Sequence, residues 1–277
     1  MDQTLRTATV TGQTRILFIL ADPVEHVRGS ALLTDFFQRQ GVDAVVAPLH
    51  VRPPELETVL QGLRRLHNVA GFGVTIPHKI AVVPLLDAVT ERARAVGAVN
   101  FVGRGADGRL HGDNIDGIGF IAGLRQGGVD PAGLSVLQVG AGGAGRAIAF
   151  ALAAAGVRHL RIANRSVEKA AELAAAVQAA YPACTCEAGP ANPAGFGLVV
   201  NTTSLGMQPG DALPLPTEAL TPDCIVAEVI MTPSVTPLMA AAQARGCRVI
   251  AGRAMLEGQM DAAARIAGLW GGAEAQP

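Results

Sequence analysis

Short apolar runs alternate with longer helix-like stretches along this chain, and this alternation limits the possible folds more than any other feature. Runs that are apolar throughout are typical of strands in a parallel sheet, because helices cover both faces of such a sheet. In the first part of the chain we expect strands at 15–20, 44–49 and 69–75, with helices at 30–40 and 53–67. The sequence therefore predicts an α/β fold with a parallel sheet.

The residues that follow this first series are less regular. Pro77 can begin a helix, since proline is favoured at the first helical position. Residues 96–102 and 108–112 resemble two strands on either side of the turn 106–108, which predicts a hairpin. A helix is expected over 116–127.

The alternation begins again after the segment GVDPAG at 128–133, which breaks the chain. Further strands are expected at 135–139, 159–163, 198–202, 224–229 and 248–250. Helices are expected at 144–155, at 167–180 and, with the only Trp, at 255–270. Because the pattern restarts, we predict two α/β domains.

Composition excludes several classes of protein. With 49% hydrophobic and 16% charged residues, the chain is expected to fold rather than to remain disordered. Its net charge is −1, no Lys/Arg block stands out and aromatic residues make up only 4%, which argues against a nucleic-acid partner. The four cysteines lack metal-site spacing, and the apolar run 16–21 is too short to span a membrane. We therefore expect a cytoplasmic protein that binds a small molecule, without a metal and without a membrane.

The strongest motif is a glycine-rich loop that follows an expected strand and opens an expected helix. Its G-x-G-x-x-G glycines are Gly140, Gly142 and Gly145, and Gly143 and Ala144 lie between them. The first glycine permits a tight turn, the second lets the backbone approach a pyrophosphate, and the third lets the helix pack on the strand. A packing loop is the alternative. The strand–loop–helix context favours a Rossmann domain with a doubly wound parallel sheet that binds a dinucleotide.

The end of the next expected strand bears on which dinucleotide binds. An acidic residue there would accept hydrogen bonds from the ribose 2′-hydroxyl of NAD, and none is present. Asn164, Arg165, Ser166 and Lys169 offer cations and polar groups that suit a 2′-phosphate instead. Asn164 and Ser166 could alternatively form only a turn and a helix cap. We predict that the cofactor is NADP.

A polar run, NTTSLGM at 201–207, follows the apolar stretch 198–200 of an expected strand. Polar residues at the carboxyl end of a parallel strand face the ligand crevice of an open sheet, which makes Thr203 a candidate cofactor contact. A turn that satisfies its own backbone groups is the alternative.

Three further motifs carry candidate chemistry. Lys79 stands in VTIPHK, Asn100 ends GAVN, and Asp116 lies in GDNIDG. Taken singly, such a Lys and Asp are more often solvated charges. Together, a Lys–carboxylate pair can move one proton to or from a hydroxyl while a nicotinamide moves a hydride.

The order VTIPHK, GAVN, GDNIDG, GAGGAGRA, NRS, NTTSLGM and TPLM, with a closing Gln259, resembles the shikimate dehydrogenase family from about residue 16 to 270. The resemblance implies reduction of 3-dehydroshikimate to shikimate with NADPH, within aromatic amino acid biosynthesis. It also implies that Lys79 and Asp116 are the catalytic pair and that Asn100, Gln259 and Thr75 bind the substrate.

The resemblance also implies a discontinuous N-terminal domain, because the last helix returns to it. We therefore predict a substrate-binding domain at 1–116 with 252–277, and an NADP-binding domain at 117–251. The protein is expected to be a monomer or a homodimer.

The chain departs from the family in the residues that surround the substrate. Val27 and Gly29 replace two serines whose hydroxyls hold the substrate carboxylate in the family, Phe101 replaces a common Thr, and Ile230 replaces a Tyr. We hypothesise that Arg28 binds the acid group instead, with an exposed surface Arg as the alternative.

Several functions therefore remain open. The substrate could be quinate or an amino-substituted shikimate. A ligand sensor without turnover would not need both Lys79 and Asp116. A folate dehydrogenase fits the glycine loop but not GDNIDG after GAVN.

Overall fold

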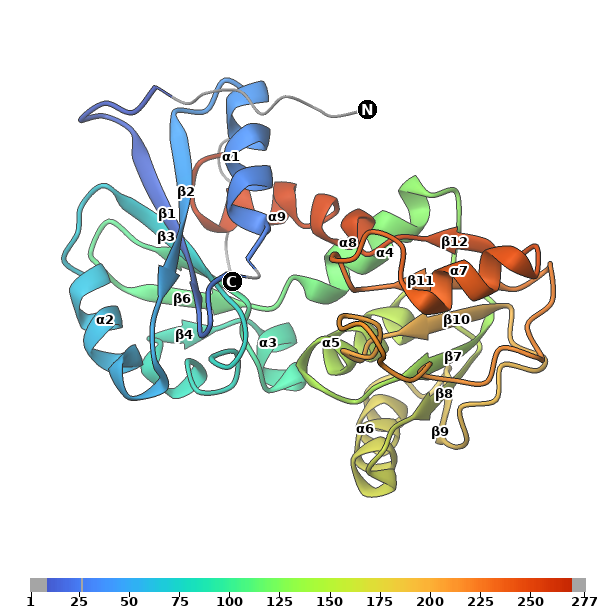
Figure 1. Cartoon of the computed structure of the whole chain (residues 1–277). Helices are drawn as coiled ribbons and strands as arrows, with labels where there is room; N and C mark the ends of the chain where they lie inside the picture. The colour runs from blue at the N-terminus through green and yellow to red at the C-terminus, as the bar shows by residue number, and fades with distance from the viewer. Residues whose placement is uncertain (1–8, 26, 271–277) are drawn as a thin grey trace. The chain divides into compact units, whose positions relative to one another are not determined.

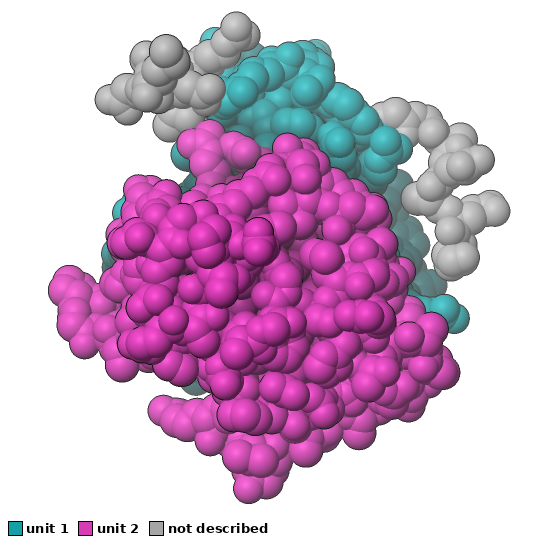
Figure 2. Space-filling view, turned by 90° about the vertical axis from the view of Figure 1, so that its right-hand side faces the viewer, with its two compact units in different colours: residues 1–115, 260–277 teal, residues 116–259 magenta. Residues whose placement is uncertain are grey.

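The computed structural model describes residues 9–25 and 27–270 (Figure 1). The chain forms two compact units, which Figure 2 shows in different colours. Unit 1 consists of the residues up to Ile115 together with those from Met260 onward, and unit 2 is the continuous stretch Asp116–Gln259. Both units are α/β, which confirms the predicted fold class.

Unit 1 contains a six-stranded sheet in the order β2-β1-β3-β5-β6-β4. The first three strands along the chain pair in parallel, whereas β5 runs antiparallel to both β3 and β6. The sheet of this unit is therefore mixed, whereas its first strands had predicted a parallel one. Only five residues separate β5 from β6, and a connection of that length allows an antiparallel hairpin but no crossover. The strands are β1 Arg15–Ala21, β2 Ala44–His50, β3 Val69–Val74, β4 Ala88–Val89, β5 Phe101–Arg104 and β6 Leu110–Asp113.

Short helices surround this sheet: α1 Gly29–Arg39, α2 Leu56–Leu63, α3 Glu91–Val96 and α9 Met260–Ile266. A 3-10 turn at Pro53–Glu55 leads into α2. Side chains of the strands pack against α2 and α3 in a core that includes Leu20, Leu60, Phe72, Val102 and Leu110.

Two predictions for unit 1 were wrong in detail. The strand expected from Val96 begins only at Phe101, because Val96 ends helix α3 and Gly97 follows it in the left-handed conformation at φ 72°. No α-helix begins at Pro77. In such a helix Val83 N would donate to Lys79 O, but Lys79 O accepts from Val99 N at 2.8 Å, and Val83 N donates to Ile80 O, only three residues earlier. Residues 76–82 form successive turns instead.

Unit 2 contains six parallel strands in the order β12-β11-β10-β7-β8-β9. The chain builds outward from β7 through β8 to β9 and then crosses to β10 on the other side of β7. The order therefore reverses between β7 and β10, and ligands of open parallel sheets bind at the carboxyl ends of the strands at such a point. The strands are β7 Ser135–Val139, β8 His159–Ala163, β9 Thr185–Ala188, β10 Leu198–Asn201, β11 Ile225–Glu228 and β12 Arg248–Ile250.

The helices of unit 2 are α4 Asp116–Gln126, α5 Gly143–Ala154, α6 Val167–Ala180, α7 Pro237–Ala244 and α8 Arg253–Glu257. Alternate residues of one strand point to opposite faces of a sheet. Accordingly, Val136 of β7 belongs to one buried cluster, with α5 and α6, whereas Leu137 and Val139 belong to a second, with α7.

The helix expected over 255–270 is two helices, α8 and α9, interrupted at Gly258 and Gln259. Helix α8 packs so closely on α4 that a Cβ added to Gly123 would lie 2.6 Å from the backbone of Ala254. The boundary between the units consequently lies after Gln259, whereas we had placed it at 252. Among the residues described, no helix is both long enough and apolar enough to cross a membrane.

Candidate active site

The glycine-rich loop of unit 2 has the conformation that its sequence predicts. Gly140 has a φ of 113°, Gly142 is the N-cap of α5 and Gly143 is the first residue of that helix, with Ala144 next. A Cβ added to Gly145 would lie 2.6 Å from both Gly140 O and Thr202 Oγ1, so the third glycine is required by packing. A Cβ added to Gly142 would meet nothing within 4 Å, which leaves space there for a ligand.

Three polar side chains hold this loop in place. The fully buried Gln138 donates from Nε2 to Gly140 O at 2.9 Å and to Gly145 O at 2.8 Å. Thr202 Oγ1 lies 2.9 Å from Val139 O and 3.1 Å from Gly140 O. Asn164 Oδ1 accepts from Ala141 N at 3.3 Å. The loop is therefore preorganised by contacts from β7 and from the residues that follow β8 and β10. The roles of Gln138 and Thr202 were not predicted from the sequence.

The four polar residues expected to hold a 2′-phosphate fall into two groups. Asn164 supports the glycine loop, and Ser166 caps α6 by accepting from Lys169 N at 3.4 Å while it donates to Glu168 Oε2 at 2.8 Å. These are the turn and cap roles that we considered as the alternative. The side chains of Arg165 and Lys169 are exposed, so these two cations are the groups available for an anionic ligand.

The turn after β10 contains the polar run NTTSLGM. Asn201 is fully buried, and its Oδ1 accepts from Thr203 N at 3.0 Å and from Thr203 Oγ1 at 2.7 Å. Its Nδ2 donates to both carboxylate oxygens of Glu228, at 3.0 and 3.1 Å. Burial raises the pKa of the Glu228 carboxyl, while hydrogen bonds from Asn201, Thr236 and nearby backbone groups act in the opposite direction. Glu228 was not identified from the sequence.

In unit 1 the segment that carries Lys79 follows β3. Thr75 N donates to Leu20 O at 3.0 Å, and His78 N donates to Thr75 O at 2.8 Å. The His78 ring is buried and its Nε2 lies 2.7 Å from Val51 O, which ties the segment to the end of β2. Lys79 is half-buried, and the neighbouring Ile80 is exposed. The buried His78 ring thus holds Lys79 in the segment that follows the carboxyl end of β3.

Asn100 lies where the hairpin begins. It is 7% exposed, and its Oδ1 accepts from Ile115 N at 2.8 Å. The buried Asp113 stabilises the same region, because it accepts from Thr90 Oγ1 at 2.6 Å and forms an ion pair with Arg92. Asn100 N donates to Asp113 O at 3.0 Å, so Asn100 is held both by the end of β6 and by Ile115.

Asp116 and Gln259 lie together in unit 2. Asp116 is the first residue of α4 and is 4% exposed, and Gln259 Nε2 donates to its Oδ1 at 3.3 Å. A carboxylate in the first turn of a helix is stabilised by the helix dipole. The two residues are 143 positions apart in the sequence and were predicted separately.

The residues that replace family hydroxyls are mostly apolar and packed. Phe101 and Ile230 are 4% and 5% exposed, and Val27 is half-buried. Gly29 begins α1, and Arg28, the N-cap residue of that helix, is exposed and makes no side-chain cap. The structure thus leaves the Arg28 guanidinium accessible to a ligand or to solvent.

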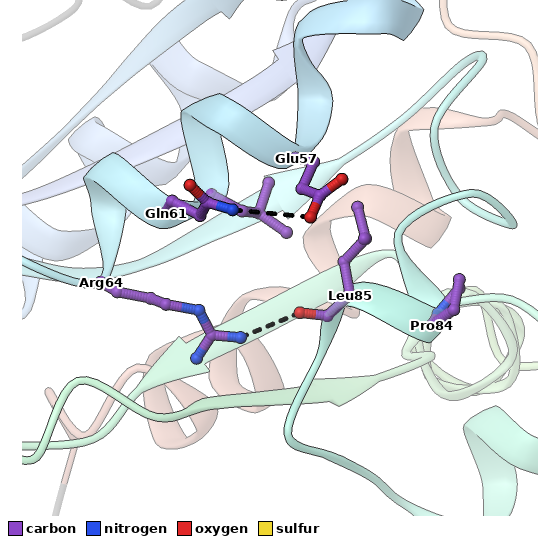
Figure 3. A pocket seen from close by; sticks show the side chains of 6 residues that line it. Glu57, Gln61, Arg64, Pro84 and Leu85 are labelled. Atoms are coloured by element: carbon purple, nitrogen blue, oxygen red, sulfur yellow. Dashed lines mark hydrogen bonds between the residues drawn. The ribbon is translucent and has the colours of Figure 1, made fainter.

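A separate hollow in unit 1 does not coincide with these residues. Figure 3 shows Arg64 donating to Leu85 O at 2.9 Å and Gln61 donating to Glu57 at 3.5 Å across its wall. Its polar groups therefore pair with one another. In the part of the chain that the structure describes, no group of three or more His, Cys, Asp or Glu side chains could hold a metal ion.

Comparisons with known proteins cover both units. A family model described as the shikimate dehydrogenase substrate binding domain matches residues 19–102, and one described as shikimate / quinate 5-dehydrogenase matches residues 126–203. The chain is 40% identical over 276 residues to the shikimate dehydrogenase (NADP(+)) of Geobacter metallireducens. The match covers 97% of this chain and 95% of that protein.

Solved structures resemble the chain over a similar length. One is a shikimate dehydrogenase from Thermus thermophilus in complex with NADP(H) and shikimate, with a TM-score of 0.84, 31% identity and coverage of 92% of this chain and 93% of that one. Another is a 5-ketofructose reductase of Gluconobacter, with a TM-score of 0.83, 33% identity and the same coverage.

Proposed function

Because the chain belongs to the shikimate dehydrogenase family, we propose that it is an NADP-dependent dehydrogenase that interconverts 3-dehydroshikimate and shikimate or a close analogue. The observation that supports this most directly is the buried carboxylate of Asp116 beside the amide of Gln259. An acceptor and a flexible amide donor side by side can bind the hydroxyl groups of a polyhydroxylated ring.

The two units take different parts in this proposal. Unit 2 binds NADP, with the pyrophosphate at Gly142 and the start of α5, and with the 2′-phosphate at Arg165 and Lys169. Thr203 contacts the cofactor from the turn after β10. Unit 1 supplies Thr75, Lys79 and Asn100 for the substrate.

The proposed chemistry separates hydride and proton. Bound in unit 2, NADP would supply the hydride donor or acceptor, its nicotinamide ring. Lys79 gives the matching proton to the substrate oxygen in reduction and takes it back in oxidation, since the amine of a lysine can exist with or without that proton. Asp116 accepts a hydrogen bond from a substrate hydroxyl, and Gln259 and Asn100 hold further hydroxyls. We propose that the protein does this in the cytoplasm as a monomer or a homodimer, with no nucleic-acid partner.

Steady-state rates with NADP⁺ and shikimate, quinate or an amino-substituted shikimate test the proposed function. Turnover of at least one of these compounds is expected. A protein that binds NADP⁺ but turns over none of these compounds, in either direction, and does not reduce 5-ketofructose, would be a ligand sensor of the same fold.

A second candidate substrate is supported by the loop before α1. Val27 and Gly29 offer no hydroxyl to a carboxylate, and a reductase of the uncharged ketose 5-ketofructose is similar to this chain. An uncharged polyhydroxy ketone would need no carboxylate-binding group. The same assay with 5-ketofructose and NADPH distinguishes this candidate from shikimate.

Replacing Arg165 with Ala should reduce the preference for NADP over NAD. The guanidinium is exposed, so we expect its contact with a 2′-phosphate to contribute at the low end of the range for charged hydrogen bonds, about tenfold in kcat/KM. The measurement is the ratio of kcat/KM for the two cofactors in both proteins. Equal ratios in the unmutated protein and the variant would remove Arg165 from the site.

Replacing Arg28 with Ala tests the alternative acid-binding group. If Arg28 binds the substrate carboxylate, KM for an acidic substrate should rise roughly tenfold, while KM for the methyl ester of that substrate should change little. Equal changes for acid and ester would show that Arg28 is an exposed side chain without a role in substrate binding.

A further inference from the structure

Glu228 is a buried carboxylate at the carboxyl end of β11 that the proposed chemistry does not use. It is 1% exposed. Its Oε1 accepts from Val229 N at 3.0 Å and from Ile230 N at 3.3 Å, and its Oε2 accepts from Thr236 Oγ1 at 3.0 Å. Burying a carboxylate is costly unless its oxygens are paired, and each of these donors is a neutral group.

The contact with Asn201 gives this carboxylate a role beyond its own strand. Asn201 Nδ2 donates to both Glu228 oxygens, at 3.0 and 3.1 Å, and to Leu205 O at 3.2 Å, and these three acceptors together hold the Asn201 amide in one orientation. Its Oδ1 is then turned toward Thr203, from which it accepts two hydrogen bonds. If the amide flipped, an NH2 group would face the Thr203 N–H, and the bond from that N–H would be lost.

The turn that Asn201 holds also contacts the glycine loop. Thr202, between Asn201 and Thr203, bonds to Val139 O and Gly140 O through its Oγ1, and the same atom occupies the space that a Cβ at position 145 would need. Strands β7, β10 and β11 are neighbours in the sheet (Figure 1). A chain of contacts therefore runs along their carboxyl ends from Glu228 to the loop that opens α5.

We propose that Glu228 is a positioning residue for the cofactor site: it orients Asn201, which holds the turn at Thr202 and Thr203 against the glycine loop. This inference rests on the proposed function, because it assigns that turn to cofactor binding. It also links the motifs NTTSLGM and TPLM, since Thr236 both donates to Glu228 and caps α7.

The first variant is Glu228→Gln, which keeps the shape of the side chain but places a donor opposite Asn201 Nδ2 or Thr236. We expect the Kd for NADP⁺, measured by isothermal titration calorimetry, to rise about tenfold. The KM for NADP should rise in parallel, while kcat at saturation stays within about twofold. Glu187→Gln is the matched control, because Glu187 lies in β9 of the same unit, half exposed, and pairs with Arg161 and His159.

A reciprocal exchange provides the sharper test. Asn201→Asp places two carboxylates about 3 Å apart and should weaken NADP⁺ binding more than Glu228→Gln does. In the double variant Asn201→Asp with Glu228→Gln, the new amide at position 228 can donate to the new carboxylate at position 201, which still accepts from Thr203. The double variant should therefore bind NADP⁺ more tightly than Asn201→Asp alone. If Glu228→Gln does not fold, Asn201→Ala removes the same link and should give the same loss of affinity.

Two results would overturn the proposal. One is a fall in Tm for Glu228→Gln with an unchanged Kd for NADP⁺, which would make Glu228 a structural residue only. The other is a double variant that binds no better than Asn201→Asp. If the unmutated protein itself binds no NADP⁺, the proposed function fails and this inference fails with it. If it binds NADP⁺ and both Glu228→Gln and Asn201→Ala bind equally well, this inference alone is wrong.

Discussion

Replacing Lys79 with Ala should lower kcat by about 10² to 10⁴, the usual contribution of a positioned acid–base group. The Kd for NADP⁺ should barely change, because Lys79 is assigned to the proton of the substrate and not to the cofactor. Pre-steady-state and steady-state rates on the best substrate measure the first effect, and calorimetry measures the second. Nearly full activity in the variant would move the proton-transfer role to another residue.

Lys79→Arg separates the charge of Lys79 from its proton transfer. A guanidinium stays protonated in proteins, so it keeps the positive charge but cannot exchange the proton. We expect a loss of kcat close to that of Lys79→Ala, with a smaller change in the KM for the substrate. Asp116→Ala should affect both kcat and KM, because Asp116 is assigned to a substrate hydroxyl.

Alanine at either of two glycines of the loop should weaken NADP⁺ binding, but only one of the two substitutions should also lower stability. Gly142→Ala introduces a methyl group with open space around it and a φ of −78° that alanine adopts readily, so Tm should hardly change. If the pyrophosphate passes there, that methyl group should weaken NADP⁺ binding by about 1–3 kcal/mol, roughly 5- to 150-fold. Calorimetry and a thermal melt measure the two quantities.

Gly145→Ala should instead reduce both stability and cofactor affinity. Its Cβ would lie 2.6 Å from the backbone oxygen of Gly140 and from Thr202 Oγ1, and neither group can withdraw without moving the loop. Overpacking of this kind costs about 1–3 kcal/mol of unfolding free energy. Unchanged NADP⁺ affinity in both glycine variants would show that the loop has only a packing role.

Much of unit 2 could be predicted because its local signals agree with its tertiary contacts. Helix α6 has the predicted bounds Val167–Ala180, since an alanine-rich stretch follows a serine that caps it. Strand β9 at Thr185–Ala188 was missed. It lies at the sheet edge with alternately exposed and half-buried side chains, and it has no apolar run.

Unit 1 was harder to predict because short apolar segments fit either a helix or a strand. The run from Val96 to Val102 looks like one strand, yet the left-handed conformation of Gly97 ends a helix inside it. The left-handed conformation of a glycine cannot be predicted from the pattern of apolar residues alone.

The candidate site was predicted one residue at a time, and its supporting contacts were not. Asp116 and Gln259 were each singled out, but only the folded chain brings Gln259 Nε2 to the Asp116 carboxylate. Gln138, His78 and Glu228 were missed, because each acts through burial and hydrogen bonds that form only in the folded chain. A polar residue inside an apolar strand, such as Gln138 in Ser135–Val139, was the one local signal that could have pointed to such a contact.

The division of the chain has a consequence for its synthesis. Unit 2 is one continuous stretch, so it can fold as soon as Gln259 has emerged from the ribosome. Unit 1 cannot be completed at that time, because helix α9 comes last, and its Ile266 carbonyl lies directly against the bare backbone of Gly103 in β5. Most of unit 1 is translated first, yet its packing at Gly103 can be completed only after α9 has been made.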